Sequence, residues 1–146
     1  MKNNILQAAI LSINDGILSN FSLIMGLVGT GMDNRLIILA GISAMFAGAL
    51  SMGIGEWLAT NVAHQYSPIM TAVTSFSMFA LGAFIPIIPF FFLSNNIVIV
   101  SGLLCANVLF NVGVLDAKQN RIWSGLKHTG LGLLSAAITY AIGSIL

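Results

Sequence analysis

Two carboxylates and a thioether lie within apolar stretches of this 146-residue sequence. Asp15 stands in the first apolar stretch, and Glu56 interrupts the segment GALSMGIGEWLA (48–59) one helical turn after Met52. An acidic side chain at the centre of a membrane costs roughly 3 kcal/mol by insertion measurements, so such residues are rare and usually functional. Carboxylates bind cations and also take up protons, and a buried Asp can exchange one for the other. These residues therefore predict a path for a cation.

The composition places the chain in a membrane. Hydrophobic residues make up 58% of it and charged residues 6%, whereas ordinary globular domains carry about 25% charged residues. So few charges cannot cover a surface that faces water. We therefore predict an integral membrane protein, and the length predicts one domain that spans residues 1–146.

Several other classes of protein are excluded by the sequence. The net charge of +1 and the lack of a basic patch exclude a nucleic-acid partner. Cys105 is the only cysteine, so disulfides within the chain and cysteine metal clusters are impossible, and we interpret it as an apolar packing residue. His64 and His128 lack the spacing of a ligand pair, and the sequence has no nucleophile–base pair. We expect no enzymatic activity and no bound cofactor.

Five segments are long and apolar enough to cross a bilayer, which requires about 20 residues. They run over roughly 5–28, 36–63, 67–93, 97–115 and 121–144. Backbone polar groups in lipid must be satisfied within the protein, and the sequence lacks the alternating pattern of barrel strands. We predict an all-α membrane protein with five transmembrane helices.

The positive charges in the short loops predict the orientation. With five spans, Lys2, Lys118, Arg121 and Lys127 lie on one side of the membrane and Arg35 on the other. This asymmetry predicts a cytoplasmic N-terminus and an external C-terminus. The chain has no convincing internal repeat, so an inverted-repeat transporter is not indicated.

Polar residues follow helical spacing in the first two spans. In the first span the steps of three and four place one set on a single helix face: Ser12, Asp15, Ser19 and Ser22. In the second span a stripe is formed by Met45, Ala49, Met52 and Glu56. Beside it runs a stripe of small residues, which we interpret as a helix-packing surface: Gly41, Ala44, Gly48, Ser51 and Gly55.

Antiparallel pairing of the first two spans brings these faces to the same depth. The loop between them is centred near residue 32, so Asp15 lies level with about residue 49. Met52 is three residues further along, roughly 4–5 Å at a rise of 1.5 Å per residue, and Glu56 lies one more turn toward the predicted cytoplasmic side. We therefore expect Asp15, Met52 and Glu56 to lie along one ion path. Accessory positions along this path are Ser19, Met45 and Ser12.

A thioether beside carboxylates favours a transition metal such as Fe²⁺ over Mg²⁺ or Ca²⁺, which prefer shells of oxygen alone. The residues themselves thus predict a cation transporter, with proton coupling as a further hypothesis. One alternative is a small proton-coupled exporter of organic cations, but it would need an aromatic cage, and the first span offers only Phe21. Another is a membrane scaffold that transports nothing, which would have no reason to keep Asp15.

Three motifs resemble those of the vacuolar iron transporters, a family of ferrous-iron and manganese carriers of plants, fungi and prokaryotes. DGILSNF (15–21) is similar to the first-span motif, SMGIGEWLA (51–59) to the second-span signature, and FALGAFIPIIPF (79–90) to the Pro-x-x-Pro end of the third span. SGLK (124–127) and AAITYAIG (136–143) also match the family's pattern. The resemblance covers nearly the whole chain.

The resemblance implies a five-helix protomer and a homodimer whose ion path lies between the subunits. It further implies transport of Fe²⁺, or of Mn²⁺, out of the cytosol in exchange for protons. By motif position, Asp15 and Met52 correspond to residues of the ion path, and Glu56 corresponds to the motif acid at the cytoplasmic mouth. Two copies of Asp15 and Met52 would supply four ligands, where one copy supplies too few.

The chain departs from the family in two places. Many members insert a cytosolic helical domain rich in Glu and Met between the second and third spans, whereas here about a dozen residues, none acidic, separate Glu56 from Pro68. The chain resembles a minimal form, which leaves open how metal is captured. Gly48 stands where some members have an acid. The small size and the lack of a targeting extension favour a prokaryotic inner membrane as the location.

Overall fold

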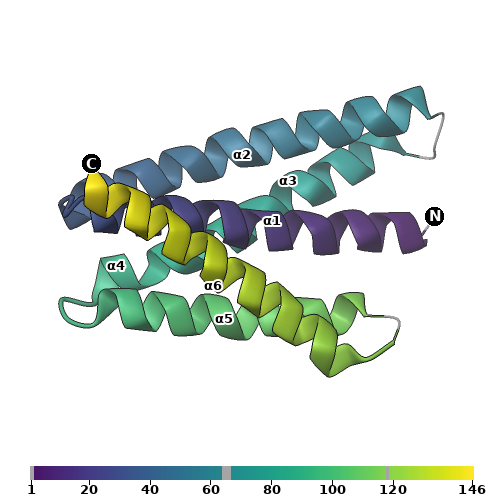
Figure 1. Cartoon of the computed structure of the whole chain (residues 1–146). Coiled ribbons are helices and arrows are strands. Elements are labelled where there is room, and N and C mark those ends of the chain that lie inside the picture. The colour runs from purple at the N-terminus through teal and green to yellow at the C-terminus, as the bar shows by residue number, and fades with distance from the viewer. Residues whose placement is uncertain (1, 64–66, 118) are drawn as a thin grey trace.

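The chain folds into a bundle of long helices, which confirms the predicted all-α class (Figure 1). The computed structural model describes residues 2–63, 67–117 and 119–146, with side chains from residue 5 onward, so His64 and Lys118 lie outside the described residues. The elements are α1 (Lys2–Gly29), α2 (Asn34–Val62), α3 (Pro68–Phe84), η1 (Ile85–Ile87), α4 (Ile88–Phe92), α5 (Ile97–Asp116) and α6 (Arg121–Ile145). No strand is present in these ranges.

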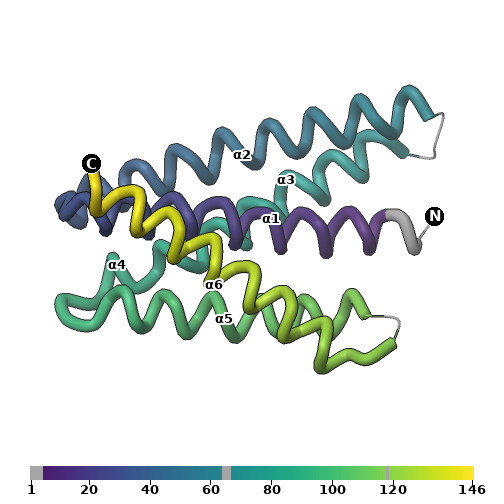
Figure 2. Tube along the Cα trace, in the orientation of Figure 1, coloured from purple at the N-terminus to yellow at the C-terminus, as the bar shows by residue number. Residues whose placement is uncertain are grey.

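Five spans are long and apolar enough to cross a membrane, with α3, η1 and α4 joined into one span over Pro68–Phe92. Each boundary lies within two residues of the prediction. Because the number of spans is odd, the two termini lie at opposite ends of the bundle (Figure 2). Which end faces the cytoplasm stays a prediction from the charged loops.

Local signals in the sequence explain where these helices begin and where the third span changes direction. Asp33 caps α2, since its carboxylate accepts a hydrogen bond of 2.8 Å from the backbone N–H of Arg35. Pro68 opens α3, where the lack of an amide hydrogen has no consequence. Pro86 and Pro89 also lack this hydrogen, and around them the chain tightens into the 3₁₀ turn η1 before α4 begins.

Helix α1 runs through the middle of the bundle and packs most extensively against α3 and α6. Glycines permit these close approaches. A Cβ atom on Gly16 would collide with the carbonyl oxygen of Phe79, and one on Gly82 would collide with that of Ile13. On the α6 side, a Cβ on Gly143 would collide with the carbonyl oxygen of Gly26. Small residues that let backbones meet are the usual means of helix association in membranes.

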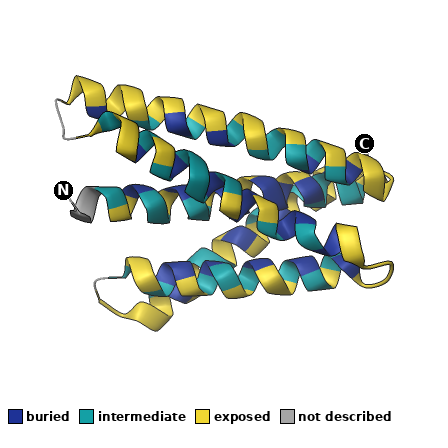
Figure 3. Cartoon of the chain, turned by 180° about the vertical axis from the view of Figure 1, so that it is seen from behind, coloured by how far each residue is buried: buried dark blue, intermediate teal, exposed yellow. Residues whose placement is uncertain are grey.

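The outer faces of the helices are apolar and exposed, while burial is confined to the seams between them (Figure 3). Exposed side chains include Leu39, Leu50 and Leu103, at 61%, 54% and 66% exposure. Apolar surface of this extent suits contact with lipid rather than with water. Together with the five apolar spans, it identifies an integral membrane protein.

Candidate functional site

A pocket of about 320 Å³ opens on the side of the bundle between α1 and α2. Its lining comes from α1, α2 and one residue of α3: Asp15, Ser19, Gly48, Ser51, Met52, Gly55, Glu56 and Phe79. Four residues expected along the ion path, Asp15, Ser19, Met52 and Glu56, are therefore brought together in one pocket. They meet because i, i+4 spacing aligns side chains along each helix and because the two helices run antiparallel at matching depth.

The Asp15 carboxylate is free to bind a ligand. Its side chain is exposed in the single chain, and no hydrogen bond or ion pair to it is found within the described part of the chain. The neighbouring Ser19 hydroxyl donates its hydrogen to the backbone oxygen of Asp15 at 2.6 Å. The Ser19 oxygen therefore offers only lone pairs to the pocket. Both groups suit a cation.

Met52 lies between the pocket and the protein interior. It is half-buried and packs against the cluster of Ala49, Phe79 and Ala83, while it also contributes to the pocket lining. Glu56, also half-buried, lies one turn further along α2. A thioether held at the wall of a pocket between two acids is a donor set that favours transition metals over Mg²⁺.

The other two accessory positions, Ser12 and Met45, do not line this pocket, and their place along the ion path stays a prediction. Ser12 precedes Asp15 by three residues, an offset of about 60° around the helix, and shares the side of α1 on which Gly16 meets α3. It is accordingly fully buried. Met45 lies two turns from Met52 and packs against the same interior cluster of Ala49 and Phe79.

The glycine stripe of α2 has two different uses. Gly41 packs against Ile87, and a Cβ on Gly48 would collide with the ring of Phe79, as expected for a packing surface. Gly55 differs from this expectation, because a Cβ there would meet nothing within 4 Å. The stripe therefore leaves its Gly55 end open, and Gly55 becomes part of the pocket wall.

Asn20 supports the pocket, although the polar spacing of the first span does not single it out. Its side chain is 2% exposed, and its amide nitrogen donates to the carbonyl oxygens of Gly41 at 3.2 Å and Ala83 at 2.6 Å. These bonds tie α1 to both α2 and α3, the helices that line the pocket. The available signal was an amide side chain inside the DGILSNF motif, but it lies off the face that carries Asp15 and Ser19.

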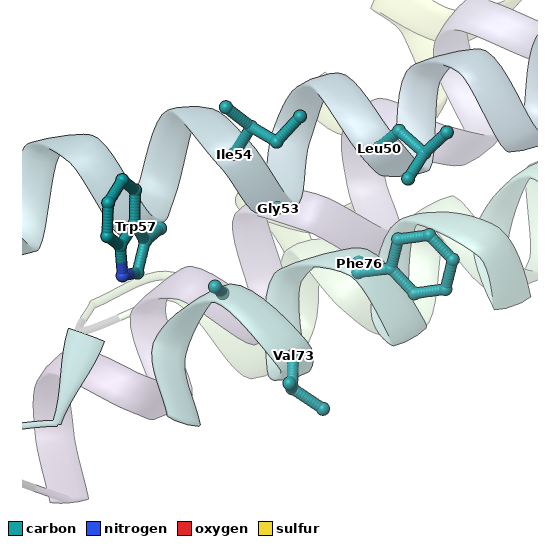
Figure 4. A pocket seen from close by; sticks show the side chains of 7 residues that line it. Leu50, Gly53, Ile54, Trp57, Val73 and Phe76 are labelled. Atoms are coloured by element: carbon teal, nitrogen blue, oxygen red, sulfur yellow. The ribbon is translucent and has the colours of Figure 1, made fainter. Parts of the chain in front are cut away.

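One hollow in the bundle, between α2 and α3, lacks the chemistry for a cation. The groove between α2 and α3 is lined by apolar side chains that include Leu50, Ile54, Val73 and Phe76, with the indole nitrogen of Trp57 as its polar atom (Figure 4). This groove suits lipid chains. Within the described ranges, no group of three or more His, Cys, Asp or Glu side chains is placed to hold a metal.

Comparisons with known proteins show which family the chain is similar to. A sequence model described as the VIT family matches residues 6–67 and 60–144. The protein named vacuolar iron transporter homolog 3 of Arabidopsis thaliana is 31% identical in an alignment 167 positions long. The alignment covers 97% of this chain and 82% of the relative. Vacuolar iron transporter homolog 4 of the same plant is 32% identical, over 92% of this chain and 80% of the relative. VIT-like transporter 1a of Glycine max is 28% identical, with 80% and 71% covered.

Proposed function

The chain belongs to the VIT family of vacuolar iron transporters, and on that premise we propose that it moves Fe²⁺, or Mn²⁺, out of the cytosol in exchange for protons. The observation that carries this proposal is the meeting of Asp15, Met52 and Glu56 in one pocket on the side of the bundle. Transport of a metal ion also accounts for costly acids within apolar spans.

The pocket supports a homodimer as the working form. It opens outward, and of its two carboxylates that of Glu56 lies one helical turn beyond Met52. At Asp15 itself, one chain then supplies one carboxylate, one thioether and a serine hydroxyl, which are too few ligands for a metal. A two-fold axis along the pocket mouth would place the same patch of a second copy opposite, since symmetric dimers present one surface to itself. Two Asp15 carboxylates and two Met52 sulfurs would then surround the ion, with water completing the shell.

The two pocket acids take separate roles in this proposal. Asp15 holds the metal or a proton in turn, because its carboxylate is free of partners within the described chain. Glu56 lies closer to the end of the bundle where α1 begins, which is the predicted cytoplasmic side. The prokaryotic inner membrane stays a prediction, and the Arabidopsis relatives carry the word vacuolar in their names.

An exporter of organic cations fits the pocket less well. Such a site needs aromatic rings around the cation, and the lining contains one, that of Phe79. Phe21 does not contribute, because it is 3% exposed and packs in a different cluster with Ile17 and Cys105. A scaffold without transport would leave the free Asp15 carboxylate without a purpose.

Flux into liposomes tests the proposal. Purified protein is reconstituted with an iron-sensitive dye inside and a proton gradient that is acidic inside, and Fe²⁺ or Mn²⁺ is added outside. We expect flux from the wild type and its loss in Asp15→Asn and Met52→Ala. Asp33→Asn is the matched control, since Asp33 lies outside the pocket and Asn also caps helices. Absence of flux from the wild type, or equal flux from all variants, would refute metal transport through this pocket.

Cross-linking tests the dimer separately. A cysteine introduced at Ser51, on the exposed wall of the pocket, should form a disulfide between two copies in membranes. A cysteine at Leu103, on the outer face of α5, should form fewer such bonds. Equal yields from both sites would argue against an interface at the pocket.

A further inference from the structure

A second pocket, of about 500 Å³, lies at the end of the bundle where α1 begins. Four helices contribute to it, and the polar part of its lining is Gln7 from α1, Glu56 and Thr60 from α2, Thr71 from α3 and Asp116 from α5. Glu56 also lines the Asp15 pocket, so the two pockets share one carboxylate. We propose that this second pocket is a capture site, where a hydrated divalent cation binds before it reaches Asp15. This inference rests on the proposed transport function.

The lining of the second pocket accepts hydrogen bonds and carries negative charge. Glu56 and Asp116 bring two carboxylates from distant parts of the sequence, and the described lining contains no Lys, Arg or His. Thr60 and Thr71 are 8% and 5% exposed. Each donates its hydroxyl hydrogen to a carbonyl of its own helix, Thr60 to Glu56 at 2.6 Å and Thr71 to Ser67 at 3.3 Å. Their oxygens have only lone pairs left, which suits a cation and not an anion.

Two further polar groups lie one helical turn inward from this lining. Ser12 follows Ala8 on the same face of α1, and Ser75 follows Thr71 on the same face of α3. Both serines are fully buried, and their hydroxyls make no hydrogen bond within the described part of the chain. Buried polar groups in proteins almost always have a partner, which can be water or an ion. Two hydroxyls without a partner in the described chain thus lie behind the polar lining, on the same helix faces as Ala8 and Thr71.

The two pockets differ in their ligands, and this difference predicts different roles for them. Carboxylate, hydroxyl and amide oxygens are hard ligands that bind Mg²⁺ and Ca²⁺ as readily as Fe²⁺ or Mn²⁺. A volume of about 500 Å³ holds an ion with its water shell. Selection of Fe²⁺ or Mn²⁺ over Mg²⁺ and Ca²⁺ then takes place at the Asp15 pocket, where Met52 adds a thioether. The capture site would thus perform the role that a cytosolic metal-binding domain has in longer members of the family.

Transport kinetics with Asp116→Asn test the inference. We expect the KM for Mn²⁺ to rise about five-fold, as expected for loss of one charge near a partly hydrated ion, while the maximal flux stays unchanged. Asp33→Asn, at the opposite end of the bundle, should keep the wild-type KM. Excess Mg²⁺ should raise the KM of the wild type more than that of Asp116→Asn. An unchanged KM for Asp116→Asn in a chain that transports would overturn the capture site and leave the transport function standing.

Direct binding separates failure of this inference from failure of transport. In detergent, Mn²⁺ bound to Asp15→Asn protein is measured by the loss of the free-ion electron paramagnetic resonance signal. Asp15→Asn should retain Mn²⁺, and the double variant with Asp116→Asn should lose it, with size-exclusion chromatography showing that both fold alike. Equal binding by the two proteins, or no binding by either, would overturn the capture site whether or not the wild type transports.

Discussion

The contact between α1 and α3 allows a quantitative test of how the bundle is held together. A methyl group added at Gly82 collides with the carbonyl oxygen of Ile13 and lies 3.1 Å from its carbonyl carbon and 3.2 Å from its Cα. All three are backbone atoms of a helix, so the obstacle cannot move aside as a flexible side chain would. The helices must separate, and the reciprocal contact of Gly16 with Phe79 is lost with them.

The expected destabilisation follows from three contributions. Replacing Gly by Ala favours a helix by about 1 kcal/mol. Overpacking a tight contact costs about 1–3 kcal/mol, and strain on the neighbouring Asn20–Ala83 hydrogen bond costs about 0.6 kcal/mol, the average for such bonds in a membrane. Gly82→Ala should therefore be less stable than the wild type by about 0.5–2.5 kcal/mol, although its helix propensity is higher.

Gly130 supplies a matched control on α6. A Cβ there would meet nothing within 4 Å, so Gly130→Ala retains the gain in helix propensity without a clash. The free energy of unfolding, measured by titration with SDS in mild detergent and followed by circular dichroism, should differ between the two variants by about 1.5–3.5 kcal/mol. Equal stability of Gly82→Ala and Gly130→Ala would refute the claim that backbone contact at Gly82 sets the distance between α1 and α3.

Further perturbations test other parts of the molecule. Asn20→Leu removes both hydrogen bonds to Gly41 and Ala83 and should lower the free energy of unfolding by about 1 kcal/mol in the same SDS titration. Gly55→Leu should abolish metal flux into liposomes without changing the circular dichroism spectrum, because a Cβ atom there meets nothing within 4 Å and a longer side chain would occupy the open pocket. Met52→Leu keeps the volume but not the sulfur, so competition assays should show a reduced preference for Fe²⁺ over Mn²⁺. Cys105 is fully buried and should resist a maleimide reagent until SDS unfolds the protein, as mass spectrometry would record.

The spans and the Asp15 pocket could be predicted because each depends on features of one or two neighbouring helices. Length and apolarity define a membrane helix, and these gave all five spans within two residues. The approach of Asp15 to Met52 needed only helical spacing and the antiparallel arrangement that a short loop imposes on α1 and α2. The sharing of one pocket by these residues and Glu56 then follows.

Other features depend on how non-adjacent helices meet, which spacing alone does not specify. Ser12 and Asp15 share a polar face in sequence, yet the crossing of α1 and α3 buries one and exposes the other. Asp116 reaches the second pocket only because α5 ends at the same end of the bundle as the start of α1, from which Gln7, Ala8 and Leu11 also line this pocket. In a membrane protein, the side of a helix that faces lipid and the side that faces other helices are both apolar. Hydropathy therefore does not predict which side is buried.

The apolar outer faces of the bundle have a consequence for how such a sequence diverges. Lipid accepts Leu, Ile, Val or Phe at a position such as Leu39 or Leu103, where no protein atom requires a particular shape. We therefore expect mutations there to have little effect, and mutations of Gly16, Gly82 and Asn20 at the seams to be poorly tolerated. Relatives can therefore differ at about two thirds of the aligned positions, as those at 31% and 32% identity do, and still match this chain over most of its length. We expect the substitutions among them to concentrate on the side of each helix that faces lipid.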